Sequence, residues 1–323
     1  MGINAFEQQL NEWGRSEKPF FFLIDFEKQN PLILPLADAQ KQGIYFQLED
    51  QRNFTPTAPA NSPRIRHKKV LDYTHYQRAF DRVQQHLQQG DSYLLNLTFP
   101  TPIDLEGTLR DVFFAAQSTH KLYLKDRFVC FSPERFIQIQ NNQISTYPMK
   151  GTADAQNPAA AQKILQNSKE LWEHSTTVDL LRNDLSIHAH RIEVDQFRYL
   201  DTIETSDKKL LQVSSKISGH LNDDWKSKIG TLLWEMLPAG SVSGAPKTKT
   251  CDIIASVEAQ NRGYYTGVYG IFDGTNLNSA VAIRYIELKE GQYYYRSGGG
   301  ITAQSNCQEE YDELIQKIYV PAL

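Results

Sequence analysis

Short apolar runs bounded by turn residues dominate the first fifty positions of the chain. The runs "PFFFLIDF" (19–26), "NPLILPL" (30–36) and "GIYFQL" (43–48) are each flanked by proline, glycine, asparagine or aspartate. Runs of this kind predict three β-strands. The polar, proline-bearing stretch at 51–68 predicts an exposed loop.

Helical spacing replaces this pattern in the next segment, "THYQRAFDRVQQHLQQG", and predicts a helix over 74–90 that ends at Gly90. The following run, "SYLLNLTFP", predicts a strand over 92–100. Residues 126–152 are typical of a strand, an Asn-Asn turn and a second strand, so Lys150 is expected near the end of a hairpin arm.

The second half of the chain alternates helical and strand patterns. Asn157 and Pro158 form an N-cap and first-turn pair before a long helix over 159–182 that is expected to break near Ser168. The last helix is expected to begin with a capping box of Ser305 and Gln308. The other predicted elements are helices at 225–237 and 248–260, a loop at 238–247 and strands from 264 to 297.

These elements predict the α+β class, with a large mixed, mostly antiparallel β-sandwich core flanked by helices. A chain of 323 residues with 40% hydrophobic content buries a large core, and no linker divides it, so one large structural unit is expected. The net charge of -4 excludes partners that need a basic surface, such as nucleic acid or an anionic membrane. The run "FFFLI" is too short to span a bilayer, and the three cysteines form no metal or redox motif, which favours a reduced, cytoplasmic protein.

Two predicted helices carry glutamates three residues apart, Glu170 with Glu173 and Glu310 with Glu313. Residues at this spacing share a helix face, so each pair presents two carboxylates in one direction. If the two faces meet, the oxygens would suit Mg²⁺. The alternative is that both pairs are simply solvated.

Two glycine-containing stretches, "GSVSGAPK" (240–247) and "SGGGIT" (297–302), match neither the P-loop nor the dinucleotide-binding spacing. Both are compatible with turns that need positive φ. Alternatively, Gly298, Gly299 and Gly300 let an anionic ligand approach the backbone closely.

Seven motifs occur in an order that marks one family, and through them the chain resembles the chorismate-utilising enzymes from about residue 70 to its end. The family includes anthranilate synthase component I, aminodeoxychorismate synthase component I, isochorismate synthase and salicylate synthase. The resemblance implies a catalytic domain over 71–323, with residues 1–70 as a shortened N-terminal portion packed on the core. The motifs are "PMKGT", "EHSTTVDLLRNDL", "PAGSVSGAPK", "RGYYTG", "AIRY", "SGGGI" and "EEYDELIQK".

The resemblance also implies roles for particular residues. Glu173 and Glu310 would be inner Mg²⁺ ligands, Glu170 and Glu313 would complete the shell, and Glu134 in "SPERF" would be the general acid. The residues expected to bind the substrate are Asn96, Thr152, Tyr265, Arg284, Gly298, Gly299, Gly300 and Lys317.

Within the family, Lys150 indicates closest resemblance to the aminodeoxychorismate synthases, which serve para-aminobenzoate and folate synthesis. It resembles a nucleophile that attacks ring carbon two of chorismate before ammonia enters at carbon four, which requires a pKa lowered by roughly three units. Leu94 stands where water-adding members carry a lysine, and Asn96 matches the aminodeoxychorismate synthases. Gln212 replaces a histidine that the family associates with pyruvate elimination.

Ammonia must come from elsewhere, because none of the three cysteines lies in a tight glycine-flanked turn suited to glutamine hydrolysis. A separate glutamine amidotransferase subunit is therefore implied. The alternatives are an isochorismate-type or anthranilate-type enzyme and a non-catalytic chorismate-binding protein.

Overall fold

Two compact units that interleave along the chain make up the protein, for which a computed structural model describes residues 3–154, 158–204 and 209–320. The first unit combines Met1–Asp38, Glu134–Ser241 and Gly267–Val281. The second combines Ala39–Pro133, Val242–Thr266 and Ala282–Leu323. Residues 1–70 thus contribute to both units. That they are a shortened form of the family's N-terminal portion stays a prediction.

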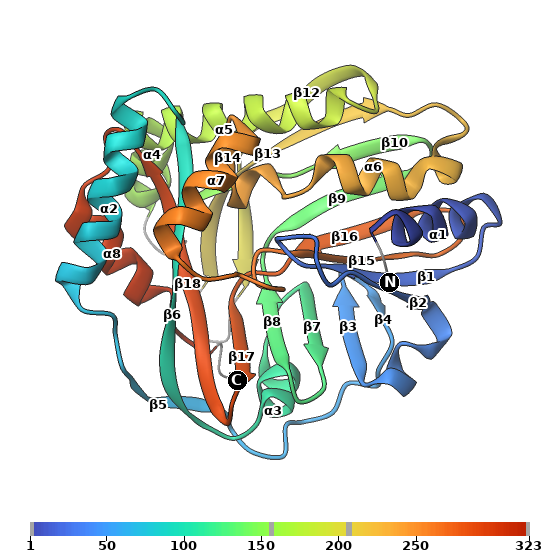
Figure 1. The fold of residues 1–323 in the computed structure, drawn as a ribbon, viewed down its shortest axis with the longest axis horizontal. Helices are drawn as coiled ribbons and strands as arrows, with labels where there is room; N and C mark the ends of the chain where they lie inside the picture. The colour runs from blue at the N-terminus through green and yellow to red at the C-terminus, as the bar shows by residue number, and fades with distance from the viewer. Residues whose placement is uncertain (1–2, 155–157, 205–208, 321–323) are drawn as a thin grey trace. The chain divides into compact units, whose positions relative to one another are not determined.

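The first unit is built on a nine-stranded sheet in the order β11-β13-β10-β9-β16-β15-β1-β2, with β12 paired to β13 (Figure 1). Its pairings are antiparallel. The strands are β1 (Phe20–Ile24), β2 (Leu32–Pro35), β9 (Arg135–Gln140), β10 (Gln143–Thr146), β11 (Met149–Asp154), β12 (His190–Glu204), β13 (Lys209–His220), β15 (Val268–Phe272) and β16 (Leu277–Val281).

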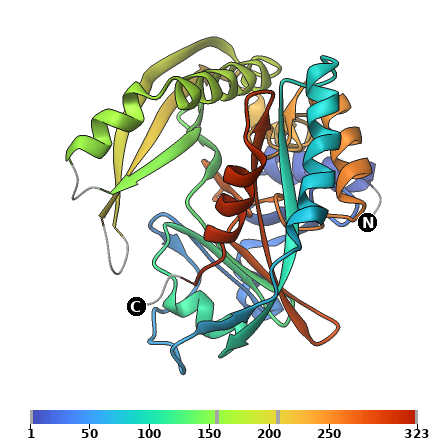
Figure 2. The same ribbon diagram turned by 90° about the vertical axis from the view of Figure 1, so that its left-hand side faces the viewer.

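Helices cover this sheet because their apolar side chains need a partner surface. Helix α1 packs beside α6, and its Trp13 ring lies 6.2 Å from the Phe20 ring of β1. Helix α5 lies along the sheet near β12 and β13 (Figure 2). The helices of this unit are α1 (Ile3–Arg15), α4 (Pro158–Gln166), α5 (Ser168–Ser186) and α6 (Ile229–Met236), with short 3-10 turns at Leu36–Asp38 and Trp225–Lys228. A further 3-10 turn, Gly240–Val242, spans the point in the sequence where the second unit resumes.

The second unit has its own nine-stranded sheet, in the order β14-β6-β18-β17-β8-β7-β3-β4, with β5 paired to β6. These pairings are also antiparallel. The strands are β3 (Ile44–Leu48), β4 (Gln51–Arg52), β5 (Arg64–Lys68), β6 (Leu94–Glu106), β7 (His120–Leu124), β8 (Phe128–Ser132), β14 (Gly244–Ala245), β17 (Tyr285–Lys289) and β18 (Gln292–Thr302).

Helix α2 packs on β18 between α7 and α8, and buries a stripe that includes Tyr76, Phe80 and Val83 (Figure 2). Asp72 caps its first turn by accepting from the backbone amides of Thr74 and His75. The helices of this unit are α2 (Tyr73–Gln88), α3 (Leu109–Ala115), α7 (Lys247–Glu258) and α8 (Cys307–Gln316), with a 3-10 turn at Gln40–Gln42.

The predicted α+β class with antiparallel sheets is confirmed, as are several local features. Asn141 and Asn142 have φ values of 51° and 58°, as a tight hairpin turn between β9 and β10 requires. The long helix breaks where expected, since Asn167 caps the start of α5 by accepting from the Glu170 amide. Asn157 lies outside the described residues.

Other local expectations are wrong. The stretch 51–68 is not all loop, because β4 and β5 form within it by pairing with β3 and β6. Asn306, not Ser305, caps α8. The Ser305 hydroxyl donates to the Glu310 carboxylate at 2.7 Å and is not available for the cap.

The strand that carries Lys150 also differs from its prediction. Residues 143–146 form the hairpin arm β10, and Lys150 lies in a separate strand, β11, that pairs with β13. Local patterns do not identify β13 as the partner strand, because the pairing spans some sixty residues of chain.

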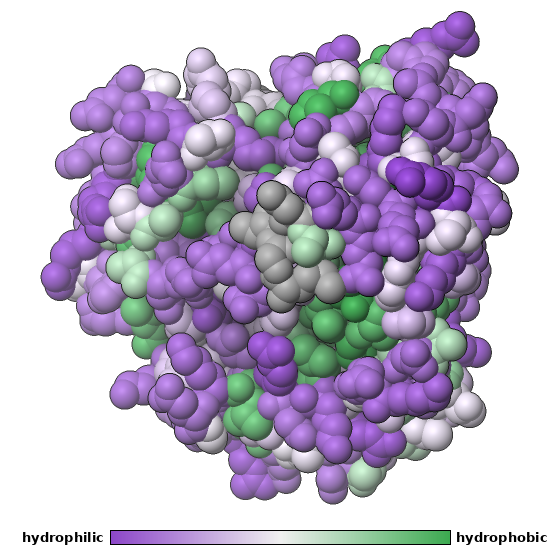
Figure 3. All heavy atoms as spheres, turned by 45° about the vertical axis from the view of Figure 1, so that its right-hand side comes forward, coloured by the Kyte–Doolittle hydropathy of each residue, from purple (hydrophilic) through white to green (hydrophobic). Residues whose placement is uncertain are grey.

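Hydrophilic side chains predominate on the face drawn in Figure 3, with hydrophobic ones in smaller areas between them. Among the described residues, no helix combines the length and the apolar character needed to cross a membrane.

Candidate active site

In the second unit, the three glycines of "SGGGIT" lie within strand β18, where a loop was expected. Gly298, Gly299 and Gly300 pair with Thr98, Leu97 and Asn96 of β6. None of the three has a positive φ, so the interpretation of this stretch as a turn is wrong. Gly244 of the other glycine stretch does have positive φ, at 146°, and pairs with Leu95.

Helix α8 brings two carboxylates and a lysine to the middle of this glycine run. A side-chain carbon added at Gly299 would lie 3.3 Å from Glu310 Oε2, 3.7 Å from Glu313 Oε1 and 3.8 Å from Lys317 Nζ. Lys317 donates to Glu313 at 2.6 Å and to the Gly298 carbonyl at 2.7 Å. Three of the predicted site residues therefore meet around a fourth, Gly299, which has no side chain.

Glu310 is 5% exposed, which is unusual for a carboxylate. Burial of an anionic group is tolerated when donors or a cation compensate it, and the Ser305 hydroxyl supplies one such donor. Ser305 was not among the predicted site residues. The serine alone resembles a capping residue, which is why the sequence did not reveal this role.

Asn96, Tyr265 and Arg284 are the predicted substrate contacts in the rest of this unit. Asn96 Oδ1 and Arg284 Nε are buried polar atoms with no hydrogen-bond partner among the residues that the structure describes. Arg284 has a φ of 53°, and its guanidinium lies 5.4 Å from the centre of the Tyr319 ring. Buried polar atoms without a partner are uncommon and call for a ligand or water.

Tyr265 follows helix α7 and is 4% exposed. Burial raises the pKa of its hydroxyl to about 12, against a smaller opposing effect of Arg262. The phenol therefore stays protonated near neutral pH and is a hydrogen-bond donor.

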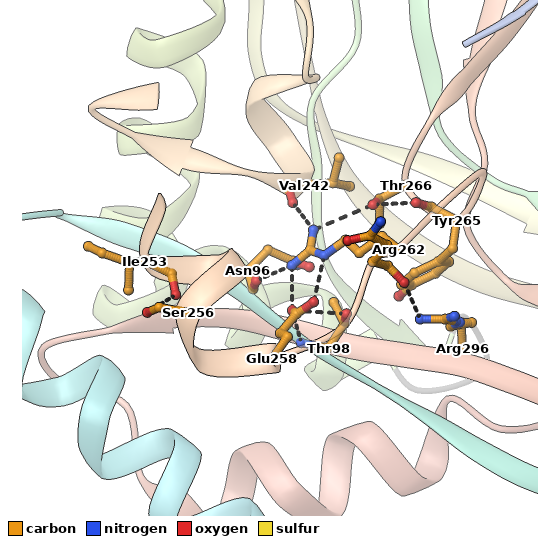
Figure 4. A network of polar contacts seen from close by, with 11 residues as sticks. Asn96, Thr98, Val242, Ile253, Ser256, Glu258, Arg262, Tyr265, Thr266 and Arg296 are labelled. Carbon is orange, nitrogen blue, oxygen red and sulfur yellow. Dashed lines mark hydrogen bonds and ion pairs between the residues drawn. The ribbon is translucent and has the colours of Figure 1, made fainter. Parts of the chain in front are cut away.

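A network of polar contacts connects the chain around Asn96 with the chain around Tyr265 (Figure 4). At its centre, Arg262 and Glu258 form an ion pair at 2.6 Å. Arg262 is the first residue of "RGYYTG", a motif that the sequence revealed without assigning a role to this arginine.

In the first unit, β11 and α5 bring two predicted site regions together. The pairing of β11 with β13 shifts register between Lys150 and Thr152, at Gly151, which has a φ of 67°. A side-chain carbon at Gly151 would lie 3.0 Å from Glu170 Oε2. The side chains of Lys150 and Thr152 lie outside the description, but their strand runs directly against the Glu170 carboxylate.

Glu173 lies one turn further along α5 and is 8% exposed. The neighbouring His174 is fully buried, and its Nε2 lies 2.6 Å from the Ser215 hydroxyl of β13. This contact holds the glutamate-bearing turn of α5 against the sheet.

Glu134 lies between β8 and β9 and accepts a hydrogen bond from the Ser241 hydroxyl. A hydroxyl donates to a carboxylate and accepts from a carboxylic acid, so this contact persists in both protonation states of Glu134. Ser241 was not among the predicted site residues. In the sequence, only its position in the motif "PAGSVSGAPK" indicated that Ser241 could have a role in the site.

The four predicted Mg²⁺ ligands belong to two units, Glu170 and Glu173 to the first and Glu310 and Glu313 to the second. No group of three or more histidine, cysteine or acidic side chains gathers at one point within the described ranges. Each pair nevertheless includes a buried carboxylate, and such oxygens are the donors that Mg²⁺ prefers. The residues fit the ion, and the metal site itself stays a prediction.

Comparison with known proteins identifies the family. The model of the chorismate binding enzymes matches residues 13–322, so the chain belongs to the chorismate binding enzyme family. It is thus an enzyme of the kind that acts on chorismate. The match begins well before residue 70, from which the resemblance was expected to run.

Three similar proteins illustrate this placement. An uncharacterized PabA-like protein of Pasteurella multocida is 52% identical over 322 residues, 99% of this chain and 99% of its own length. Aminodeoxychorismate synthase component 1 of Salmonella typhimurium is 30% identical over 92% of this chain and 66% of its own length. The structure of MenF, the menaquinone-specific isochorismate synthase of Escherichia coli, matches in fold with a TM-score of 0.71 over 97% of this chain and 80% of that chain, at 15% identity.

Proposed function

We propose that the protein aminates chorismate at ring carbon four with ammonia, giving 4-amino-4-deoxychorismate and water. Lys150 would be the nucleophile, Glu134 the general acid and Mg²⁺ the cofactor, with ammonia supplied by a separate glutamine amidotransferase. The product would serve para-aminobenzoate and folate synthesis.

The close approach of Gly151 to Glu170 carries the proposal, since a side-chain carbon at Gly151 would lie 3.0 Å from Glu170 Oε2. Gly151 follows Lys150 in β11, so the strand of Lys150 runs near a carboxylate that was chosen as a candidate metal ligand from its helical spacing to Glu173. The nucleophilic role of Lys150 is drawn from the motif "PMKGT", which resembles that of the aminodeoxychorismate synthases. Sequence identity does not separate the two amination reactions, because aminodeoxychorismate synthase component 1 of Salmonella typhimurium and anthranilate synthase component 1 of Acetivibrio thermocellus are both 30% identical to this chain, so the choice between them rests on Lys150.

Two other positions argue against the alternative reactions, one against the addition of water and one against the elimination of pyruvate. Leu94 is 3% exposed and lies in β6 opposite Ala245 and Thr302, so this position offers no base to activate water. Gln212 pairs with Thr152 next to Lys150 and offers no imidazole for the elimination of pyruvate. An enzyme with these residues would stop at the aminated intermediate.

The chemistry can be written with the residues of this chain. The neutral Lys150 amine attacks ring carbon two, the two ring double bonds shift, and the hydroxyl on carbon four leaves as water with a proton from Glu134. Ammonia then attacks carbon four, the double bonds shift back, and the Lys150 amine is expelled from carbon two.

Substrate binding would rest on the polar groups of the second unit. Arg284 and Tyr265 would donate to the anionic groups of chorismate, and Asn96 would use its buried amide oxygen, which has no partner among the described residues, to accept a hydrogen bond. When bound, Mg²⁺ would supply positive charge for the ring carboxylate, held by Glu173 and Glu310 with Glu170 and Glu313 beside them.

The test is an incubation of the purified chain with chorismate, MgCl₂ and ammonium chloride, followed by mass spectrometry and NMR of the product. We expect an amine on carbon four that retains the enolpyruvyl group, and no turnover when glutamine replaces ammonium. An isomer of chorismate would indicate the isochorismate reaction, and an aromatic amine at carbon two would indicate the anthranilate reaction. Binding without turnover would indicate a non-catalytic protein.

A further inference from the structure

Glu258 and Arg262 form a buried ion pair that has no part in the proposed chemistry. Their side chains are each 1% exposed, and both carboxylate oxygens of Glu258 accept from the guanidinium, at 2.6 and 3.0 Å. Glu258 is the last residue of α7, and Ala259 follows with a φ of 51°, which turns the chain back so that Arg262 reaches Glu258.

Every N–H of the guanidinium has an acceptor. Besides the two bonds to Glu258, Nη2 donates to the Asn96 carbonyl at 2.6 Å (Figure 4). Nη1 donates to the Val242 carbonyl at 2.8 Å and approaches the Thr266 hydroxyl at 3.4 Å. A guanidinium has five N–H donors, and here all five are used in a fixed planar geometry.

Glu258 completes the connection to strand β6. Its Oε1 accepts from the Thr98 amide at 2.8 Å and from the Thr98 hydroxyl at 3.0 Å. The pair therefore binds β6 on both sides of Leu97, at Asn96 and at Thr98. At its other end it contacts Thr266, whose hydroxyl donates to the Tyr265 carbonyl at 2.6 Å.

We propose that Glu258 and Arg262 are positioning residues that set Asn96 relative to Tyr265 in the substrate site of the second unit. This inference rests on the proposed function only in taking chorismate as the ligand of that site. Arg262 contacts the main chain of Asn96 and leaves its side-chain amide to the ligand.

The contacts favour this role over a general contribution to stability. A buried ion pair is often no more stabilising than apolar residues of the same volume. The hydrogen bonds of Arg262 instead fix the positions of particular segments, because its main-chain acceptors, the carbonyls of Asn96 and Val242, come from separate parts of the chain. Lysine offers one charged nitrogen at this position and cannot reach all of these acceptors at once.

The experiment is a double-mutant cycle on chorismate affinity, measured by isothermal titration calorimetry in MgCl₂ without ammonium. Every protein in the cycle, the reference included, carries Lys150→Ala, so that no covalent adduct with chorismate forms during the titration. We expect Arg262→Lys to raise the Kd for chorismate roughly tenfold and Asn96→Ala to raise it by a similar factor. If Arg262 acts through Asn96, its substitution in the Asn96→Ala background will change the Kd less than about twofold. The melting temperature of each variant is measured alongside, and Arg262→Gln serves if Arg262→Lys does not fold.

A matched control exists in the same unit. Lys121 is also a buried cation that donates to two main-chain carbonyls, those of Phe113 and Ala116 at 3.0 and 2.9 Å. Its strand, β7, is separated from β6 by β18, β17 and β8. Lys121→Met is expected to change the melting temperature and to leave the Kd for chorismate as in the reference protein.

An unchanged Kd in a folded Arg262→Lys protein would overturn the inference, as would equal effects of Arg262→Lys in both backgrounds. A rise in Kd after Lys121→Met as large as that after Arg262→Lys would also overturn it, since any buried cation would then matter. Failure of the proposed function has a different signature, because a wild type that binds chorismate and forms another product leaves this cycle intact.

Discussion

The side chain at position 150 decides which reaction this enzyme is expected to perform. In the absence of ammonia, chorismate should leave a covalent adduct on Lys150, which peptide mass mapping would locate. Lys150→Ala should lose the adduct and most of the activity, and any remaining product should shift toward amination at carbon two, because the space left by lysine admits ammonia there. Lys150→Arg should not restore activity, since a guanidinium stays protonated and cannot attack.

One result would contradict the nucleophilic role of Lys150. If Lys150→Ala forms the carbon-four amine at close to the wild-type rate, and neither protein carries an adduct, ammonia attacks chorismate directly. The lysine would then be a charge partner of the substrate.

The buried carboxylates allow a second test at the residue scale. Glu173→Gln and Glu310→Gln should each lower kcat/KM by more than about a hundredfold and weaken Mg²⁺ binding, because even outer partners of a metal site contribute ten- to a hundredfold. Glu309 precedes Glu310 on α8 but is exposed, so Glu309→Gln is the matched control and should behave as the wild type. Mg²⁺ titrations of activity and of intrinsic fluorescence would measure both effects, and full turnover after exhaustive chelation would contradict the role of the metal.

At the scale of elements, Gly298 and Gly299 are neighbours in strand β18 but have different surroundings, so their substitutions should have different effects. A methyl group at Gly298 would lie 2.2 Å from the Leu97 carbonyl oxygen, so the paired strands would have to separate. Gly298→Ala should lower the free energy of unfolding by roughly 1–3 kcal/mol, measured by denaturant titration.

Gly299→Ala should behave differently, because the three atoms nearest to its methyl group would be side-chain atoms of Glu310, Glu313 and Lys317, the closest at 3.3 Å. We expect a near wild-type melting temperature together with a raised KM for chorismate, since the methyl group occupies the space between the glycine run and Glu310. An unchanged KM in Gly299→Ala would show that chorismate does not approach β18 at this position.

At the scale of the whole molecule, His120 of β7 links stability to pH. It is 4% exposed, and burial lowers the pKa of its imidazole to about 4 from the ordinary 6.5. Between these two values the unfolded chain binds a proton that the folded protein does not. The free energy of unfolding should therefore fall as the pH is lowered from 6.5 to 4, by up to about 3 kcal/mol, and His120 should contribute no further change below pH 4.

His120→Gln removes the titrating group and should reduce this pH dependence. The measurement is the midpoint of urea unfolding at intervals between pH 4 and pH 7 for both proteins. Parallel curves for wild type and variant would assign the loss of stability in acid to other groups.

Local chemistry allowed much of this protein to be predicted before its structure was considered. The Asn-Asn turn after β9, the helix that ends just before Gly90 and the break before α5 all depend on residues close in sequence, and the sequence predicted them correctly. The family could also be predicted from the sequence, because its motifs are short and their order can be read directly along the chain. The candidate residues of the site were likewise selected from short patterns, the glutamate pairs from their helical spacing and the others from the family resemblance.

Tertiary structure decided what depends on partners distant in the chain. The pairing of β11 with β13 and the close approach of Gly151 to Glu170 bring together segments whose separate patterns are compatible with other arrangements. Ser241 and Arg262 gained a role for the same reason, since their acceptors lie 107 and 166 residues away along the chain, at Glu134 and Asn96. A side chain's chemistry is written in the sequence, but the atom it contacts is set only when the chain brings distant segments together to bury apolar surface.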